Sequence, residues 1–139
     1  MFNENHYVPI IRWKRGEQKA LEYLEKSLKD TMTPLIEIPP IDWDYQKEEP
    51  KKTIDEHLKA IGVVIKKSWN HDSPIFIDAY NVCSEDVELM ENGQHPLEFI
   101  LDEIHSNNLK AIPVTGIGRG TNYQNAVKKA WKPIGMDIV

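Results

Sequence analysis

Short apolar runs alternate along the chain with segments in which apolar residues recur at helical spacing. Four apolar runs stand out, at residues 7–13 (YVPIIRW), 33–38 (TPLIEI), 74–79 (PIFIDA) and 109–115 (LKAIPVT). Runs of this length that are rich in branched apolar residues are typical of strands buried on both faces. The pattern therefore predicts four strands of a parallel sheet.

Amphipathic helices are predicted between and after these runs, at residues 17–28, 54–69, 96–106 and 123–131. A capping box is predicted at the start of the helix at 54–69, because Thr53 and Glu56 can each satisfy a free backbone N–H of the other. Pro96 suits the first turn of the helix at 96–106, where a backbone N–H would have no partner inside the helix and its absence costs nothing. Residues 41–52 are polar and lack helical spacing, which predicts a long loop. The side chains expected to face the core are Ala20, Leu21, Leu24 and Leu28; Ile54, Leu58, Ile61, Ile65 and Trp69; Leu97, Ile100, Leu101 and Ile104; and Ala126, Val127 and Ala130.

Four strand-then-helix units predict an α/β fold with a parallel sheet, in a single domain over residues 1–139. Two architectures fit: an open doubly wound sheet, and a half or otherwise incomplete (β/α)8 barrel of the TIM type. A complete barrel takes about 250 residues. The chain closes on the β-forming residues MDIV, which we expect to begin a fifth strand that needs a partner. The half-barrel is therefore preferred, and it implies self-association or a missing C-terminal half.

Composition narrows the class of protein. The net charge is −5, and acidic and basic residues are interspersed, which makes a nucleic-acid partner unlikely. The single cysteine, Cys83, excludes an intramolecular disulfide, and the five histidines show no zinc-ligand spacing, so neither a metal nor a cofactor is predicted. No apolar leader or membrane-spanning window is present. We expect a cytoplasmic protein of a reducing compartment with no membrane association.

Four segments together resemble a known family. They are YVPIIRWKRGEQKAL at 7–21, TPLIEIPPI at 33–41, PIFIDAY at 74–80 and AIPVTGI at 111–117. The first is similar to the opening Y-x-P-[IL]-x-[KR]-x-K-x-G-E-x-x-A-L of the beta-protein family of bacteriophages and bacterial genomes. The resemblance covers this whole chain but only the N-terminal portion of a typical member. It implies bacteriophage or prophage biology and a barrel-like repeat, and it brings no agreed catalytic activity.

Charged and polar residues follow the predicted strands at the point where each strand ends. In parallel α/β folds the ligand lies beyond the carboxyl ends of the strands. These ends carry Arg12 and Lys14, then Glu37, then Asp78 and Tyr80, then Thr115 and Arg119. We predict Lys14, Glu37 and Asp78 as catalytic residues, because a lysine buried beside a carboxylate can act as an acid or base. The alternative is that these are structural ion pairs or strand-end charges facing water.

A glycine-rich loop, GIGRGTN, follows the fourth predicted strand at residues 116–122. Glycines permit backbone conformations that align successive N–H groups, and such a loop at a helix N-terminus can hold phosphate. The predicted ligand-binding residues are Arg12, Tyr80, Thr115, Gly116, Gly118, Arg119, Gly120 and Thr121. An ordinary flexible connection between strand and helix is the alternative.

Two functional hypotheses follow. The first is a binding protein of bacteriophage or prophage type that modulates a host or defence component, and for which residues 42–45 (DWDY) would contact the partner or pack on the barrel rim. The second is a barrel-type enzyme acting on a phosphorylated or otherwise anionic small molecule. Whether the chain is an enzyme stays open at this point, because no complete catalytic constellation is visible.

Overall fold

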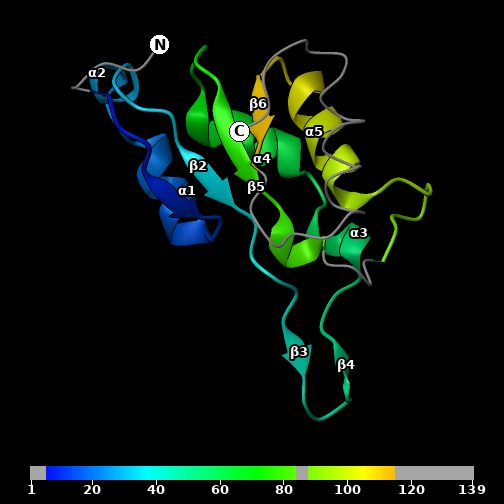
Figure 1. Ribbon diagram of the computed structural model, residues 1–139. Helices are drawn as coiled ribbons and strands as arrows, with labels where there is room; N and C mark the ends of the chain where they lie inside the picture. Colours follow the sequence, from blue (N-terminus) through cyan, green and yellow to red (C-terminus); the bar gives the residue numbers. More distant parts are fainter. Residues whose placement is uncertain (1–5, 84–87, 115–139) are drawn as a thin grey trace.

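The computed structural model describes residues 6–83 and 88–114 (Figure 1). Its centre is a four-stranded parallel sheet formed by β1 (Ile10–Arg12), β2 (Leu35–Glu37), β5 (Ile75–Asp78) and β6 (Ala111–Pro113). Within the described residues these strands lie side by side in chain order, β1-β2-β5-β6, and no closed sheet is formed. The predicted α/β class and parallel sheet are confirmed.

The register of the sheet sorts its side chains onto two faces. Arg12 pairs with Glu37 across β1 and β2, and Glu37 pairs with Asp78 across β2 and β5. Directly paired residues present their side chains on the same face of a sheet. The three residues therefore form a polar row across three neighbouring strands, at or near their carboxyl ends.

Five α-helices are formed by the described residues: α1 (Arg15–Glu22), α2 (Lys26–Lys29), α3 (Ile54–His57), α4 (Ile61–Trp69) and α5 (Pro96–Ser106). Their apolar side chains share one core with Ile36, Ile77 and Ala111 of the sheet. The opposite face carries a separate apolar cluster around Phe76 and Ile112. The helices thus cover the sheet face turned away from the polar row.

Two of the predicted helices are interrupted. The segment predicted at 17–28 is divided into α1 and α2, because Glu25 has an extended backbone with φ −64° and ψ 147°. Leu28, after the break, and Ala20, within α1, are exposed rather than buried, so the predicted apolar stripe was wrong at both. The segment predicted at 54–69 is divided into α3 and α4 by Ala60, whose φ of 59° is left-handed. Its five predicted core residues are nevertheless all buried.

The loop predicted at 41–52 contains an antiparallel hairpin of β3 (Trp43–Asp44) and β4 (Glu49–Pro50), which corrects that prediction. Figure 1 shows the hairpin extending away from the rest of the described chain. Asp44 holds its turn, since Oδ1 accepts hydrogen bonds from the backbone N–H groups of Gln46 and Lys47 at 3.0 and 3.1 Å. Strands of two residues are too short to leave a periodic signal in a sequence.

A buried lysine ties α2 to the end of α4. The Lys29 ammonium donates hydrogen bonds to the carbonyl oxygens of Ser68 and Trp69, at 3.2 and 3.0 Å, and lies 5.7 Å from the centroid of the Trp69 ring. Burial lowers the pKa of Lys29 from its usual value, an effect that nearby Glu22 partly opposes. These contacts satisfy carbonyls that the last turn of a helix leaves free. They lie just before β5, at the end of the sheet opposite the polar row.

Two half-buried histidines lie at the ends of α5. His95 precedes the helix, and its Nδ1 accepts a hydrogen bond from the Leu97 N–H at 3.1 Å. His105 lies in the last turn. Burial lowers the pKa of both side chains below the usual 6.5, and both Nε2 atoms are shut off from solvent without a hydrogen-bond partner. Burial therefore favours the neutral form of each ring in the folded protein.

This arrangement predicts acid sensitivity. A histidine whose folded pKa is depressed binds its proton more readily in the unfolded chain, so stability falls as the pH drops from about 6.5 toward the folded pKa. We expect the urea midpoint to fall between pH 7 and pH 5. His95→Asn keeps a side-chain acceptor for the helix start, and should flatten this decline together with His105→Asn. An unchanged pH profile in the double variant would contradict the assignment.

Candidate functional site

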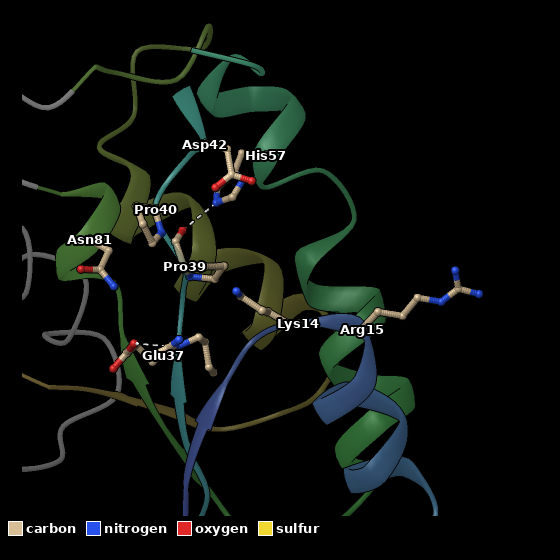
Figure 2. A pocket seen from close by; sticks show the side chains of 9 residues that line it. Lys14, Arg15, Glu37, Pro39, Pro40, Asp42, His57 and Asn81 are labelled. Carbon is tan, nitrogen blue, oxygen red and sulfur yellow. Dashed lines mark hydrogen bonds and ion pairs between the residues drawn. The ribbon is translucent and has the colours of Figure 1, made fainter. Parts of the chain in front are cut away.

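An open pocket of about 750 Å³ lies beyond the carboxyl ends of β1, β2 and β5, and we call it the strand-end pocket (Figure 2). It is lined by Arg12, Lys14, Arg15, Glu37, Pro39, Pro40, Asp42, His57 and Asn81. Parallel α/β folds place ligands at this end of their strands. Three of the predicted site residues, Arg12, Lys14 and Glu37, are brought together here.

The N-terminus of α1 adjoins this pocket. A second hollow of about 440 Å³, the helix-end hollow, shares Arg12, Lys14 and Glu37 with it and extends to Gly16. Lys14 is the residue before the helix, and its side chain forms no capping hydrogen bond. A Cβ atom built on Gly16 would meet no atom within 4 Å. The first backbone N–H groups of α1 have no partner inside the helix, and the residue before the helix does not cap them with its side chain.

The charges of the strand-end pocket are unequally partnered. Arg12 Nε lies 3.7 Å from Glu37 Oε1, so this carboxylate has a cation beside it. Within the described chain, the Lys14 side chain makes neither a hydrogen bond nor an ion pair. Figure 2 shows Lys14 extending toward Pro39, whereas Arg15 points away from the other labelled side chains. Lys14 is therefore a cation available to a ligand.

Two residues that sequence reasoning missed complete the wall. His57 Nε2 donates a hydrogen bond to the Pro39 carbonyl at 2.7 Å, which leaves Nδ1 as the acceptor of the neutral ring. Asn81 Nδ2 donates to the Ile38 carbonyl at 3.2 Å. His57 ends α3, the one-turn helix that the predicted and confirmed capping box of Thr53 begins. The capping box was a sequence signal for the helix that carries His57, but nothing in the sequence indicated that this helix lies beside Pro39.

Comparison with known proteins gives the family. The family model described as beta protein matches residues 7–135, nearly the full length of the chain. The chain belongs to the beta protein family. No curated protein and no solved structure is significantly similar to it. The resemblance noted in the sequence is confirmed, and the match names neither a ligand nor an activity.

Other predicted site residues of this beta protein family member lie elsewhere. Asp78 neighbours Glu37 in the register but does not line the strand-end pocket, and its Oδ1 accepts a hydrogen bond from the Tyr80 N–H at 3.1 Å. Tyr80 begins a short 3₁₀ helix, Tyr80–Val82. The predicted residues of the glycine-rich loop lie outside the described residues; they are Thr115, Gly116, Gly118, Arg119, Gly120 and Thr121.

Across residues 6–83 and 88–114, no group of three or more His, Cys, Asp or Glu side chains is arranged to hold a metal ion. None of the helices formed by these residues has the length and apolar character needed to cross a membrane.

Proposed function

We propose that this chain binds a small organic anion, with its phosphate or carboxylate group placed between Lys14 and the N-terminus of α1. The observation that carries the proposal is the Lys14 ammonium, which is unpaired within the described chain and lies at a helix start that no side chain caps. Free N–H groups and the positive end of the helix dipole favour an anion at this position. The side chain of Lys14, the residue before the helix, can add a full positive charge to such a site.

The net charge of the strand-end pocket supports the same ligand class. Arg12 and Lys14 supply two cations against the two carboxylates of Glu37 and Asp42, and Arg15 adds a third at the edge, with its side chain directed away from the other residues. Glu37 already lies beside Arg12, so an anion could bind at Lys14 without displacing the Glu37 carboxylate from its own cation. The proposal is one of binding. Turnover of the anion by Lys14, Glu37 and Asp78 stays a prediction, and Asp78 does not line the pocket.

A titration tests the proposal directly. Inorganic phosphate added to ¹⁵N-labelled protein at constant ionic strength should shift the backbone amides of Lys14, Gly16 and Glu17 in a saturable manner. Chloride at the same ionic strength should leave them in place. Shifts that fail to saturate, or equal shifts with chloride, would show general screening and would overturn the proposal.

The pocket is proposed to belong to an incomplete (β/α)8 barrel. Its support is the chain-order sequence of four parallel strands with helices packed on one face, since a doubly wound sheet reverses its strand order. Ile10, whose side chain lies on the sheet face that carries the polar row, is 71% exposed, as expected of a face that the other strands of a closed barrel would cover. Those strands would come from the rest of a longer chain or from a second copy.

A partner-binding function has a separate observation in its favour. On the hairpin, Trp43 is 46% and Tyr45 is 86% exposed, so both present aromatic surface to solvent. Exposed tryptophan and tyrosine are the residues that most often dominate protein interfaces. We propose this surface as the contact with a host or defence component in a bacteriophage or prophage setting. A Tyr45→Ala variant should lose partner capture and keep the phosphate titration, whereas loss of both would indicate a folding defect.

A further inference from the structure

A third hollow lies on the helix side of the strand-end pocket, between α1 and α4, and we call it the side pocket. Its volume is about 230 Å³. His57 and Pro39 line both pockets, so the 2.7 Å hydrogen bond between them forms part of the wall that separates the two. A ligand held in the strand-end pocket would have to cross only this wall to reach the side pocket.

The floor of the side pocket is apolar. Trp13, Ile38 and Ile61 line it and are all buried, and Val64 of α4 completes it. Sites that enclose an entire small ligand usually measure about 300–1,000 Å³. A hollow of this smaller size with an aromatic floor is suited to one part of a ligand, such as a single ring.

The unpaired indole N–H of Trp13 is an argument for a ligand that does not depend on the shape of the side pocket. Trp13 is only 6% exposed, and buried tryptophans usually pair this N–H. Among the described residues, Trp13 makes no hydrogen bond through its side chain. The polar side-chain atoms there that are both unpaired and shut off from solvent belong to His95 and His105. The Trp13 N–H is therefore unpaired yet accessible, and Trp13 lines the side pocket.

Further polar groups surround the apolar floor. The Gln18 amide of α1 can donate and accept, and His57 Nδ1 can accept. Lys52 and Lys59, both exposed, add two positive charges at the edge of the side pocket. A ring that carries both acceptors and donors would pair with these groups, whereas a plain hydrocarbon ring would leave them unpaired.

We infer that the side pocket holds the heteroaromatic ring of the same ligand whose anionic group lies by Lys14, and that the ligand is a mononucleotide. The inference rests on the proposed anion site. A base supplies the flat face for the Trp13 floor and the acceptor for its N–H. A sugar supplies the link across the His57–Pro39 wall, and the phosphate meets Lys14 and the α1 N-terminus.

Titrations with AMP, UMP and ribose 5-phosphate test the ring subsite. At least one nucleotide should bind about tenfold or more tightly than ribose 5-phosphate, the usual scale of one stacked base. The same titration should shift the Trp13 indole ¹H–¹⁵N resonance, assigned by its loss in Trp13→Phe. If neither base adds affinity over ribose 5-phosphate, the inference is overturned.

Two variants at neighbouring positions of α4 test whether the base binds in the side pocket. Val64→Phe would fill the side pocket, whereas Val63, on the same helix, is 58% exposed and does not line it. Val64→Phe should remove the affinity gained from the base and leave ribose 5-phosphate binding unchanged. Val63→Phe should retain both. If Val64→Phe still binds a nucleotide more tightly than ribose 5-phosphate, the base does not bind in the side pocket and the inference is overturned.

Nucleosides separate this inference from the anion proposal. Adenosine and uridine have no phosphate, so their binding reports on the side pocket alone. If inorganic phosphate and ribose 5-phosphate fail to bind but a nucleoside still shifts the Trp13 indole resonance, the anion site fails and the ring subsite stands. If phosphate binds and no nucleoside or nucleotide shifts that resonance, the anion site stands and the ring subsite fails.

Discussion

Replacing Lys14 by alanine is expected to weaken phosphate binding roughly ten- to a hundredfold, since a hydrogen bond to a charged group contributes about 1.5–3 kcal/mol. The side chain is exposed and makes no hydrogen bond or ion pair within the described chain, so its removal should leave stability nearly unchanged. Isothermal titration calorimetry gives the affinity, and urea denaturation gives the stability. A large loss of binding with an unchanged urea midpoint would assign the effect to the ligand.

Lys19 provides the matched control for this variant. It is an exposed lysine on the same helix, but it lies in the last turn and lines neither the strand-end pocket nor the helix-end hollow. Lys19→Ala removes the same formal charge and should change the affinity only slightly. Lys14→Arg, which keeps the charge with a different geometry, should lie between wild type and Lys14→Ala. Equal losses in Lys14→Ala and Lys19→Ala would mean that only net charge matters.

Part of the candidate site could be predicted from the sequence because it depends on a local rule. Side chains alternate along a strand, so Arg12 and Lys14 were expected on one side, and the rule of carboxyl ends brought Glu37 beside them. The structure brings these three together at one pocket. His57 and Asn81 could not be found this way. Both reach the pocket through hydrogen bonds to backbone carbonyls of residues 38–39, far away in the sequence.

The fold was predictable where burial alone determines it. The apolar stripe from Ile54 to Trp69 correctly identified five core residues, although the helix that carries them is broken at Ala60. Apolar spacing reports which side chains face the core and contains no information on a single residue with positive φ. The break after α1 was missed for a related reason: Glu25 is an ordinary helix former, yet it has an extended backbone at the start of α2.

The second large effect is expected at Gly62, where alanine should destabilise the protein by about 1–2 kcal/mol even though alanine is the better helix former by about 1 kcal/mol. Gly62 lies in the first turn of α4, against α5. A Cβ atom there would collide with the backbone carbonyl of Glu103 and lie 2.7 Å from Asn107 Nδ2. Asn107 Nδ2 donates a hydrogen bond to that same carbonyl at 2.7 Å, so neither group can move away without breaking it.

Gly16→Ala tests whether this loss comes from packing. Gly16 also lies in the first turn of a helix, but a Cβ atom built on it meets nothing within 4 Å. The alanine should therefore stabilise α1 by up to about 1 kcal/mol, because it restricts the unfolded chain without a steric cost in the folded one. Urea denaturation of the two variants should thus give midpoint changes of opposite sign. If Gly62→Ala also raised the midpoint, α4 and α5 would have to pack less closely than the contact at Glu103 requires.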